Sequence, residues 1–176
     1  MIRAFGSTIQ RFDILLILII SQLNRRYVID KAFFLITRLG DGPLYVIAGI
    51  LLIATPVQDG FKIVYIAILA YAIELPIYFV VKKYVKRLRP FEKMQNINHL
   101  IAPPDKYSFP SGHTAAAFVM AIVFSNHFSV LSPGLYILAG LIGISRVYLR
   151  VHYPTDIVAG AVLGIISANT SLWILG

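Results

Sequence analysis

Residues 61–84 read FKIVYIAILAYAIELPIYFVVKKY, and this stretch decides the class of fold. From residue 63 to residue 81 the only charged side chain is Glu74. A helix needs about 20 mostly apolar residues to cross a bilayer. The stretch therefore predicts a transmembrane helix over 61–84, bent near Pro76 and closed by two lysines whose charged ends reach the membrane surface.

The rest of the chain has the same character. Of its 176 residues, 58% are hydrophobic and 14% charged, whereas a soluble domain has about 45–50% apolar and about 25% charged residues. A soluble protein is excluded because each of its helices would need a polar face. We expect an all-α polytopic membrane helix bundle forming a single integral-membrane domain over residues 1–176. About six transmembrane helices (8–23, 43–54, 61–84, 111–128, 135–148, 154–175) and one interfacial amphipathic helix (27–39) are expected.

The net charge of +8 suits a partner with an anionic headgroup. A nucleic-acid partner fits poorly, since the basic residues lie beside membrane segments and not on a soluble face. We expect no obligate protein partner. The chain has no cysteine, which excludes disulfides and thiolate metal sites. The N-terminal apolar run lacks a small-residue cleavage site and is read as a retained first helix or interfacial anchor.

Three short motifs hold most of the reactive side chains. In an antiparallel bundle the ends of helices 61–84 and 135–148 and the starts of helices 111–128 and 154–175 lie on one membrane face. The motifs should therefore meet in a single site. They are Lys82-x6-Arg89-Pro90, Pro110-Ser111-Gly112-His113 and Ser145-Arg146-x5-His152-x3-Asp156.

The histidines suggest the chemistry. Asp156 begins a helix and can reach back four residues to His152, so that it fixes the ring tautomer and leaves the other nitrogen free to attack. Ser111 and Gly112 start another helix, whose free N–H groups and dipole favour an anion. His113 would face that anion from the first helical turn.

Lys82, Arg89 and Arg146 supply positive charge. Arginine matches phosphate oxygens with two parallel hydrogen bonds, and lysine acts as a point charge. Together with the histidines, these residues could hold a phosphate and transfer it to a nitrogen nucleophile.

The three motifs resemble the complete motif set of the type 2 phosphatidic acid phosphatase (PAP2) superfamily. The resemblance implies that His152 is the nucleophile, Asp156 its orienting partner and His113 the general acid. It implies that Lys82, Arg89, Ser111, Gly112 and Arg146 bind the substrate phosphate. It implies no cofactor and no metal, which agrees with the lack of a carboxylate cluster able to hold magnesium.

The expected activity is hydrolysis of a lipid phosphomonoester or diphosphate headgroup through a phosphohistidine. The excess cations on the site face suggest a polyanionic headgroup, and lipid A 1-phosphate is favoured, with undecaprenyl diphosphate and phosphatidylglycerophosphate as alternatives. These cations are Lys83, Lys86, Arg87, Lys93 and Lys106. A vanadium haloperoxidase-like enzyme, soluble and larger in known cases, and a non-enzymatic lipid-binding protein are more remote alternatives.

The resemblance places the protein in the bacterial inner membrane with its site facing the periplasm or exterior. The positive-inside rule argues for the opposite orientation, but binding roles account for many of the site-face cations. Glu74 is a candidate of a different kind, because an acid in mid-membrane is unfavourable by at least about 2.5–3.5 kcal/mol. It either contacts substrate or pairs inside the bundle. His99 and His127 are expected at the interfaces.

Overall fold

The computed structural model describes residues 2–22, 27–94, 97–103 and 105–176, with side chains from residue 8 onward. This described part is helical, and its one β-type contact is an isolated bridge between Leu88 and Tyr107. The helices are α1 (Ile2–Gln22), α2 (Tyr27–Arg38), α3 (Gly42–Ala54), α4 (Gly60–Val85), α5 (Pro90–Lys93), α6 (Gly112–His127), the 3-10 turn η1 (Ser129–Leu131), α7 (Ser132–Tyr148) and α8 (Pro154–Leu175).

The helices from residue 27 onward lie close to the ranges expected from sequence. Helix α1 starts earlier than expected, at Ile2, and its expected end at residue 23 lies outside the described residues. The short helix α5 was not expected. It forms because Pro90 suits a first helical position and because the Glu92 carboxylate accepts a hydrogen bond from the Arg89 backbone N–H at 3.0 Å.

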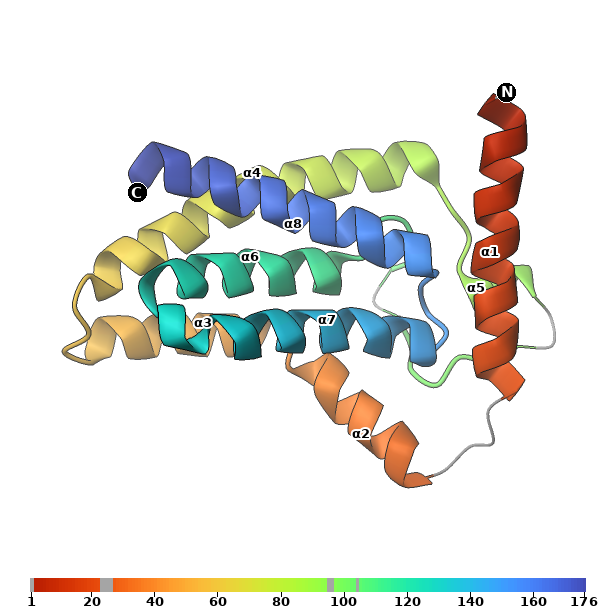
Figure 1. Cartoon of the computed structure of the whole chain (residues 1–176), viewed down its shortest axis with the longest axis horizontal. Helices are drawn as coiled ribbons and strands as arrows, with labels where there is room; N and C mark the ends of the chain where they lie inside the picture. Colours follow the sequence, from red (N-terminus) through yellow and green to blue (C-terminus); the bar gives the residue numbers. More distant parts are fainter. Residues whose placement is uncertain (1, 23–26, 95–96, 104) are drawn as a thin grey trace.

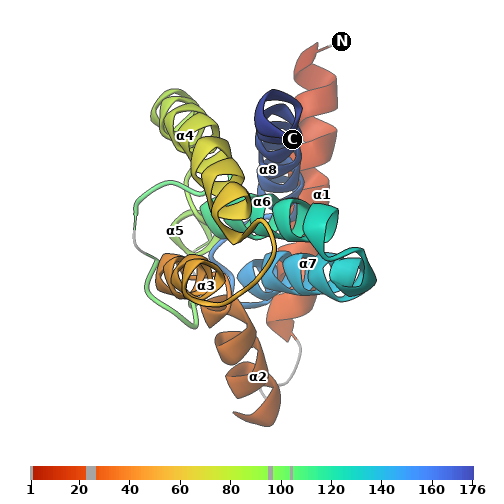
Figure 2. The same cartoon turned by 90° about the vertical axis from the view of Figure 1, so that its left-hand side faces the viewer.

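Helix α6 is the centre of the bundle and packs against α4, α7 and α8 (Figures 1 and 2). The α4–α6–α8 core is built from small and branched side chains, among them Ile66, Val119 and Ala168. Helices α6 and α8 approach closely because α8 has a glycine at their crossing. A Cβ on Gly160 would lie 2.4 Å from the carbonyl oxygen of Ser111, so any larger residue would push the two helices apart.

The outer surface of the bundle is apolar. Large side chains such as Ile68, Phe79 and Val158 are more than half exposed, which suits contact with lipid tails. Three described helical segments are long and apolar enough to cross a membrane: Gly60–Val85, Ser129–Tyr148 and Pro154–Leu175. A fourth span results if Tyr27–Arg38 and Gly42–Ala54, bent by 52° at their junction, count as one. The described part of the chain is therefore an all-helical membrane bundle, in which three or four segments, and not the expected six, are long and apolar enough to span a membrane.

The motif-bearing ends of α4, α6, α7 and α8 gather at one end of the bundle (Figure 1). Helix α1 runs across this end and contacts α7 and α8. It is fixed there by Ile17, fully buried against Val147 and Tyr153. The N-terminal helix thus closes the same end that holds the reactive side chains.

Candidate active site

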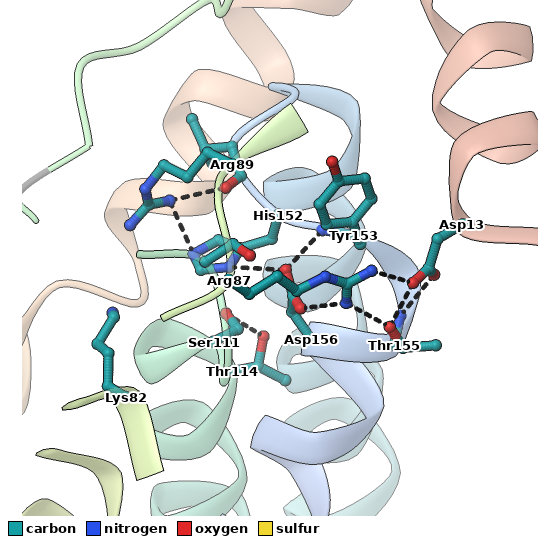
Figure 3. Close-up of polar contacts among 12 residues, drawn as sticks. Asp13, Lys82, Arg87, Arg89, Ser111, Thr114, His152, Tyr153, Thr155 and Asp156 are labelled. Carbon is teal, nitrogen blue, oxygen red and sulfur yellow. Dashed lines mark hydrogen bonds and ion pairs between the residues drawn. The ribbon is translucent and has the colours of Figure 1, made fainter. Parts of the chain in front are cut away.

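The three motifs are joined by direct hydrogen bonds. The Arg89 guanidinium donates to the Val151 carbonyl at 2.7 Å and lies 3.3 Å from Nε2 of His152. The Ser111 backbone N–H donates to the Asp156 carbonyl at 3.0 Å. Side chains that are up to 74 residues apart in the sequence, from Lys82 to Asp156, therefore form one site at the end of the bundle (Figure 3).

His152 is 2% exposed, and its ring orientation follows from its neighbours. Arginine only donates hydrogen bonds, so Nε2 accepts from Arg89 and the ring proton belongs on Nδ1. Nδ1 faces the Asp156 carboxylate at 3.6 Å, slightly longer than a hydrogen bond. Burial, together with the charges of Arg146 and Arg89, lowers the pKa of His152 to about 4. The ring is therefore neutral near pH 7, with its lone pair on Nε2.

Asp156 is held by more partners than His152. One of its oxygens accepts from the Tyr153 backbone N–H at 2.8 Å and the other from Arg87 at 2.7 Å. The Arg87 guanidinium also bonds Asp13 on α1 at 2.6 Å. Burial alone would lower the pKa of Arg87, but the two carboxylates raise it above its usual value. Arg87 thus holds the Asp156 carboxylate and ties it to α1.

Lys82 and Arg89 share a carboxylate that sequence reasoning did not single out. Asp105 lies 2.6 Å from Lys82 Nζ and 2.6 Å from Arg89 Nη2, and it accepts from the Tyr78 hydroxyl at 2.9 Å. Lys82 also donates to the Tyr78 oxygen. Burial would raise the pKa of Asp105, but these hydrogen bonds lower it below its usual value. A carboxylate therefore lies between two cations expected to bind phosphate.

The donors of Arg89 are nearly used up by these contacts. Arginine has five N–H donors. Four are engaged: two with the carboxylate and carbonyl of Asp105, one with the Val151 carbonyl and one with His152. Two parallel hydrogen bonds to a phosphate would require Arg89 to release Asp105.

Arg146 is 2% exposed and donates to the Thr37 hydroxyl of α2 at 2.8 Å. Its Nε is buried and has no hydrogen-bond partner among the described residues. An orphaned, charged N–H is unfavourable unless a ligand satisfies it. Arg146 therefore has an unused N–H donor that could form a hydrogen bond to an anion.

His113, in the first turn of α6, contacts the turn between α2 and α3. Its Nε2 lies 3.0 Å from the Asp41 carboxylate, and its side chain is 21% exposed. The charges of Arg146 and Arg89 act on both His113 and His152. The two histidines thus lie in the electrostatic field of the same pair of guanidinium groups.

Ser111 and Gly112 have structural contacts of their own. The Ser111 hydroxyl accepts a hydrogen bond from the Thr114 hydroxyl at 2.9 Å and does not cap α6, because it accepts no backbone N–H of the first turn. A Cβ on Gly112 would lie 3.0 Å from the Tyr78 ring. The glycine therefore allows α4 and its lysine to approach the start of α6.

The PAP2 superfamily model matches residues 60–176, which hold all three motifs. The chain belongs to the PAP2 superfamily. Its fold is similar to the crystal structure of Aquifex aeolicus LpxE, with a TM-score of 0.80 and 31% identity over 92% of this chain and 95% of that one. It is also similar to a PAP2-type phosphatidylglycerolphosphate phosphatase from Bacillus subtilis, with a TM-score of 0.77 and 26% identity over 95% of this chain and 86% of that one.

A curated relative is the lipid A 1-phosphatase of Porphyromonas gingivalis, 38% identical over 71 residues, which are 38% of this chain and 16% of that protein. The matched part of this chain spans less than half the length of this and of the other leading curated relatives.

Several contacts of this PAP2 site were missed from the sequence. Asp13 stands beside an apolar run, and a lone acid in such a segment is a signal that could have found it. Arg87 was grouped with the site-face cations, yet it points to Asp156 and Asp13. Asp41 lies in the short turn between α2 and α3. Asp105 carries no sequence signal that distinguishes it from any acid in a loop.

Other candidates lie apart from these contacts. The His99 ring packs on Phe91 at 4.4 Å between ring centroids. His127 lies 3.9 Å from Asp59, at the opposite end of α6 from His113. Glu74 is 2% exposed and lines an apolar cavity. Exposed lysines remain at the site end of the bundle: Lys83, Lys86, Lys93 and Lys106.

Proposed function

We propose that this protein is an integral-membrane lipid phosphatase that hydrolyses a phosphomonoester or diphosphate headgroup through a phosphohistidine on His152. The observation that carries the proposal is the geometry of that ring. Its Nδ1 faces the Asp156 carboxylate, its Nε2 faces Arg89, and burial favours its neutral form. A nucleophilic nitrogen beside phosphate-binding cations at a membrane surface fits lipid dephosphorylation.

The first step forms the phosphoenzyme. The phosphate displaces Asp105 from Lys82 and Arg89, and Arg89 gives up its hydrogen bond to Nε2 of His152. The freed Nε2 lone pair then attacks phosphorus in line. The bond from phosphorus to the lipid oxygen breaks, and protonated His113 gives its proton to that oxygen. Burial and the charge of Arg146 oppose protonation of His113, and the Asp41 carboxylate, 3.0 Å away, favours it.

The second step restores the enzyme. Water attacks the phosphohistidine, and His113 now accepts the proton from that water. The bond between phosphorus and His152 breaks, and inorganic phosphate leaves. The cations Lys82, Arg89 and Arg146 stabilise charge on the non-bridging oxygens in both steps, which should supply most of the rate enhancement. The Ser111 and Gly112 backbone is proposed to complete the phosphate site.

The mechanism needs no metal or other cofactor, and metal independence is part of the proposal. Activity should therefore persist in the presence of a chelator such as EDTA. A complete loss of activity with EDTA, restored by added magnesium, would contradict this part.

Lipid A 1-phosphate is the substrate that we favour. The P. gingivalis relative is named for that reaction, and exposed lysines at the site end suit a headgroup with several negative charges. Phosphatidylglycerophosphate and undecaprenyl diphosphate are the alternatives.

We further propose a single domain over residues 1–176 in a bacterial inner membrane, with the site facing the periplasm or exterior. About six transmembrane helices remain part of this proposal. Helices α3, α4, α6, α7 and α8 run along the bundle axis (Figure 1), whereas α1 runs across the end of the bundle and suits an interfacial helix. The chain has no cysteine, so a single cysteine introduced at Lys93 would report sidedness. Labelling only after the inner membrane is permeabilised would overturn the proposed orientation.

The decisive test is phosphate release from detergent-solubilised lipids. The panel should hold lipid A, phosphatidylglycerophosphate, undecaprenyl diphosphate and phosphatidic acid. We expect His152→Ala to abolish release from every lipid that the wild type hydrolyses. His127→Ala is the matched control, because His127 lies at the far end of α6, and it should retain activity. Wild-type activity in His152→Ala would rule out the assignment of the nucleophile.

A further inference from the structure

A cavity of about 640 Å³ lies between α3, α4 and α6. Its site end is lined by Gly112 and His113, and its far end reaches Phe124. Twelve residues of helix separate Gly112 from Phe124, so the cavity runs on the order of 18 Å along α6. Most of its wall is apolar, with side chains such as Ile50 and Met120. A lipid whose phosphate lies beside His113 would place its adjoining chain here.

One acidic residue interrupts the apolar wall. Glu74 of α4 lines the cavity and is 2% exposed. No hydrogen bond or ion pair joins its side chain to any other described residue. Burying a polar group without a hydrogen-bond partner is unfavourable. The carboxyl group therefore lacks a partner that the protein itself could supply, and it faces a space suited to a ligand.

A second unpaired polar group lies on the same cavity wall. The Tyr45 hydroxyl of α3 is buried without a hydrogen-bond partner among the described residues. Its ring stacks on Tyr71 of α4 at 6.4 Å between centroids. The Tyr71 hydroxyl is already used, because it donates to the Ala116 carbonyl at 3.2 Å. Tyr45 and Glu74 are thus the unsatisfied polar groups of this wall.

The distance of Glu74 from the phosphate site limits what it could bind. Glu74 precedes Lys82 by eight residues on the same helix, which corresponds to about 12 Å along the axis. A prenyl diphosphate has only hydrocarbon at that distance from its phosphate. In phosphatidylglycerophosphate, a glycerol and a second phosphate separate the terminal phosphate from the ester carbonyls, which places those carbonyls at a comparable distance.

We propose that Glu74 and the Tyr45 hydroxyl form a polar subsite for an acyl carbonyl of the substrate, and that this subsite selects acyl-chain lipids over prenyl diphosphates. A tyrosine hydroxyl donates to a carbonyl oxygen, as does a protonated carboxyl group, which can also accept from an amide N–H. A hydrocarbon chain would leave both groups unpaired. The inference rests on the proposed lipid phosphatase function and narrows its substrate class.

The test compares two substrates in each variant. Phosphatidylglycerophosphate and undecaprenyl diphosphate are assayed in the same detergent with wild type and Glu74→Leu. We expect kcat/KM to fall about 3- to 10-fold on the acyl lipid, as expected for one lost hydrogen bond. On the prenyl diphosphate it should change less than about 2-fold. Glu74→Gln, which still donates and accepts, should keep most of the acyl-lipid activity.

Tyr45→Phe and Tyr65→Phe form a matched pair, because each substitution removes only one hydroxyl oxygen. Tyr45→Phe should lower activity on the acyl lipid selectively and remains informative if Glu74→Leu does not fold. Tyr65→Phe is the control, because Tyr65 lies on the same bundle but is 64% exposed on its outer face. An equal loss on both lipids would assign a structural role to the pair and overturn the inference, as would no change on either lipid.

A binding measurement separates this inference from the proposed function. Diacylglycerol carries the acyl carbonyls without the phosphate. It should raise the unfolding temperature of wild type more than that of Glu74→Leu, whereas a prenyl alcohol should affect both equally. If wild type releases phosphate from no lipid, the proposed function fails, and the diacylglycerol measurement still decides the role of Glu74. Equal stabilisation of the two proteins by diacylglycerol would contradict the subsite.

Discussion

Replacing Asp105 with asparagine should tighten the binding of inorganic phosphate and of vanadate, the phosphate analogue. In the resting structure the Asp105 carboxylate takes one donor of Lys82 and one side-chain donor of Arg89, at 2.6 Å each. A bound phosphate needs those same donors. Asparagine has nearly the same shape but no charge, so it competes less well with a phosphate oxygen.

The size of the effect follows from the two contacts. A hydrogen bond to a charged group contributes about 1.5–3 kcal/mol when buried. The Asp105 side chain is 35% exposed, so solvent screening reduces each contact to about 0.5–1 kcal/mol. Removing both contacts therefore favours the phosphate by about 1–2 kcal/mol. This free energy corresponds to a 5- to 30-fold lower inhibition constant, by the tenfold change for each 1.4 kcal/mol.

The assay is competitive inhibition of lipid dephosphorylation by phosphate and vanadate. Asp59→Asn is the charge-matched control, because Asp59 lies at the opposite end of the bundle beside His127. It should leave both inhibition constants unchanged. The unfolding temperature of Asp105→Asn should fall, because Lys82 and Arg89 are buried and lose their counter-ion. A weaker inhibition by phosphate in Asp105→Asn would show that Asp105 positions the cations and does not compete with the substrate.

Three further outcomes are expected. Arg87→Met leaves the buried carboxylates of Asp13 and Asp156 without their counter-ion. It should destabilise the protein by about 3 kcal/mol and lower kcat at least about 10-fold, whereas a substitution at the exposed Lys86, Lys86→Met, should do neither. Equal effects of the two substitutions would refute this reasoning. Because the pKa of His152 is about 4, its ring nitrogens in an NMR titration should stay neutral from pH 8 down to about pH 5, and a midpoint near 6.5 would contradict the burial argument. Gly160→Ala should lower both kcat and thermal stability, because the added Cβ lies 2.4 Å from a backbone carbonyl oxygen. Gly140→Ala, with open space around it, should change neither. Wild-type kcat and stability in Gly160→Ala would show that α6 and α8 can separate without harm.

Much of the helical frame could be predicted from the sequence. Long apolar segments without charge have few alternatives to a membrane helix. The order of the helices then places the motif-bearing ends on one side, which the structure confirms for the ends of α4 and α7 and the starts of α6 and α8 (Figure 1). The PAP2 family assignment, made from three short motifs, is confirmed by the family match over residues 60–176.

The partners of the motif residues could not be predicted, for a physical reason. Local spacing places Asp156 near His152 because both lie at one helix start. No local rule brings Asp13 to Arg87 or Asp41 to His113, because those contacts depend on how α1 and the α2–α3 turn dock on the bundle. The Asp105 contact likewise depends on the path of a loop whose backbone is fixed by tertiary bonds such as Ser108 N–H to the Arg87 carbonyl, 2.8 Å long.

The central claim is that Nε2 of His152 becomes covalently phosphorylated. The most direct test is to mix the protein with lipid substrate labelled with ³²P at the phosphate, quench within milliseconds in alkali and map the label by peptide analysis. We predict acid-labile label on His152 in the wild type and no label in His152→Ala. In His113→Ala the amount of label should be larger if hydrolysis of the intermediate slows more than its formation. Phosphate release by the wild type with no trapped label, or label on His152→Ala, would contradict the account.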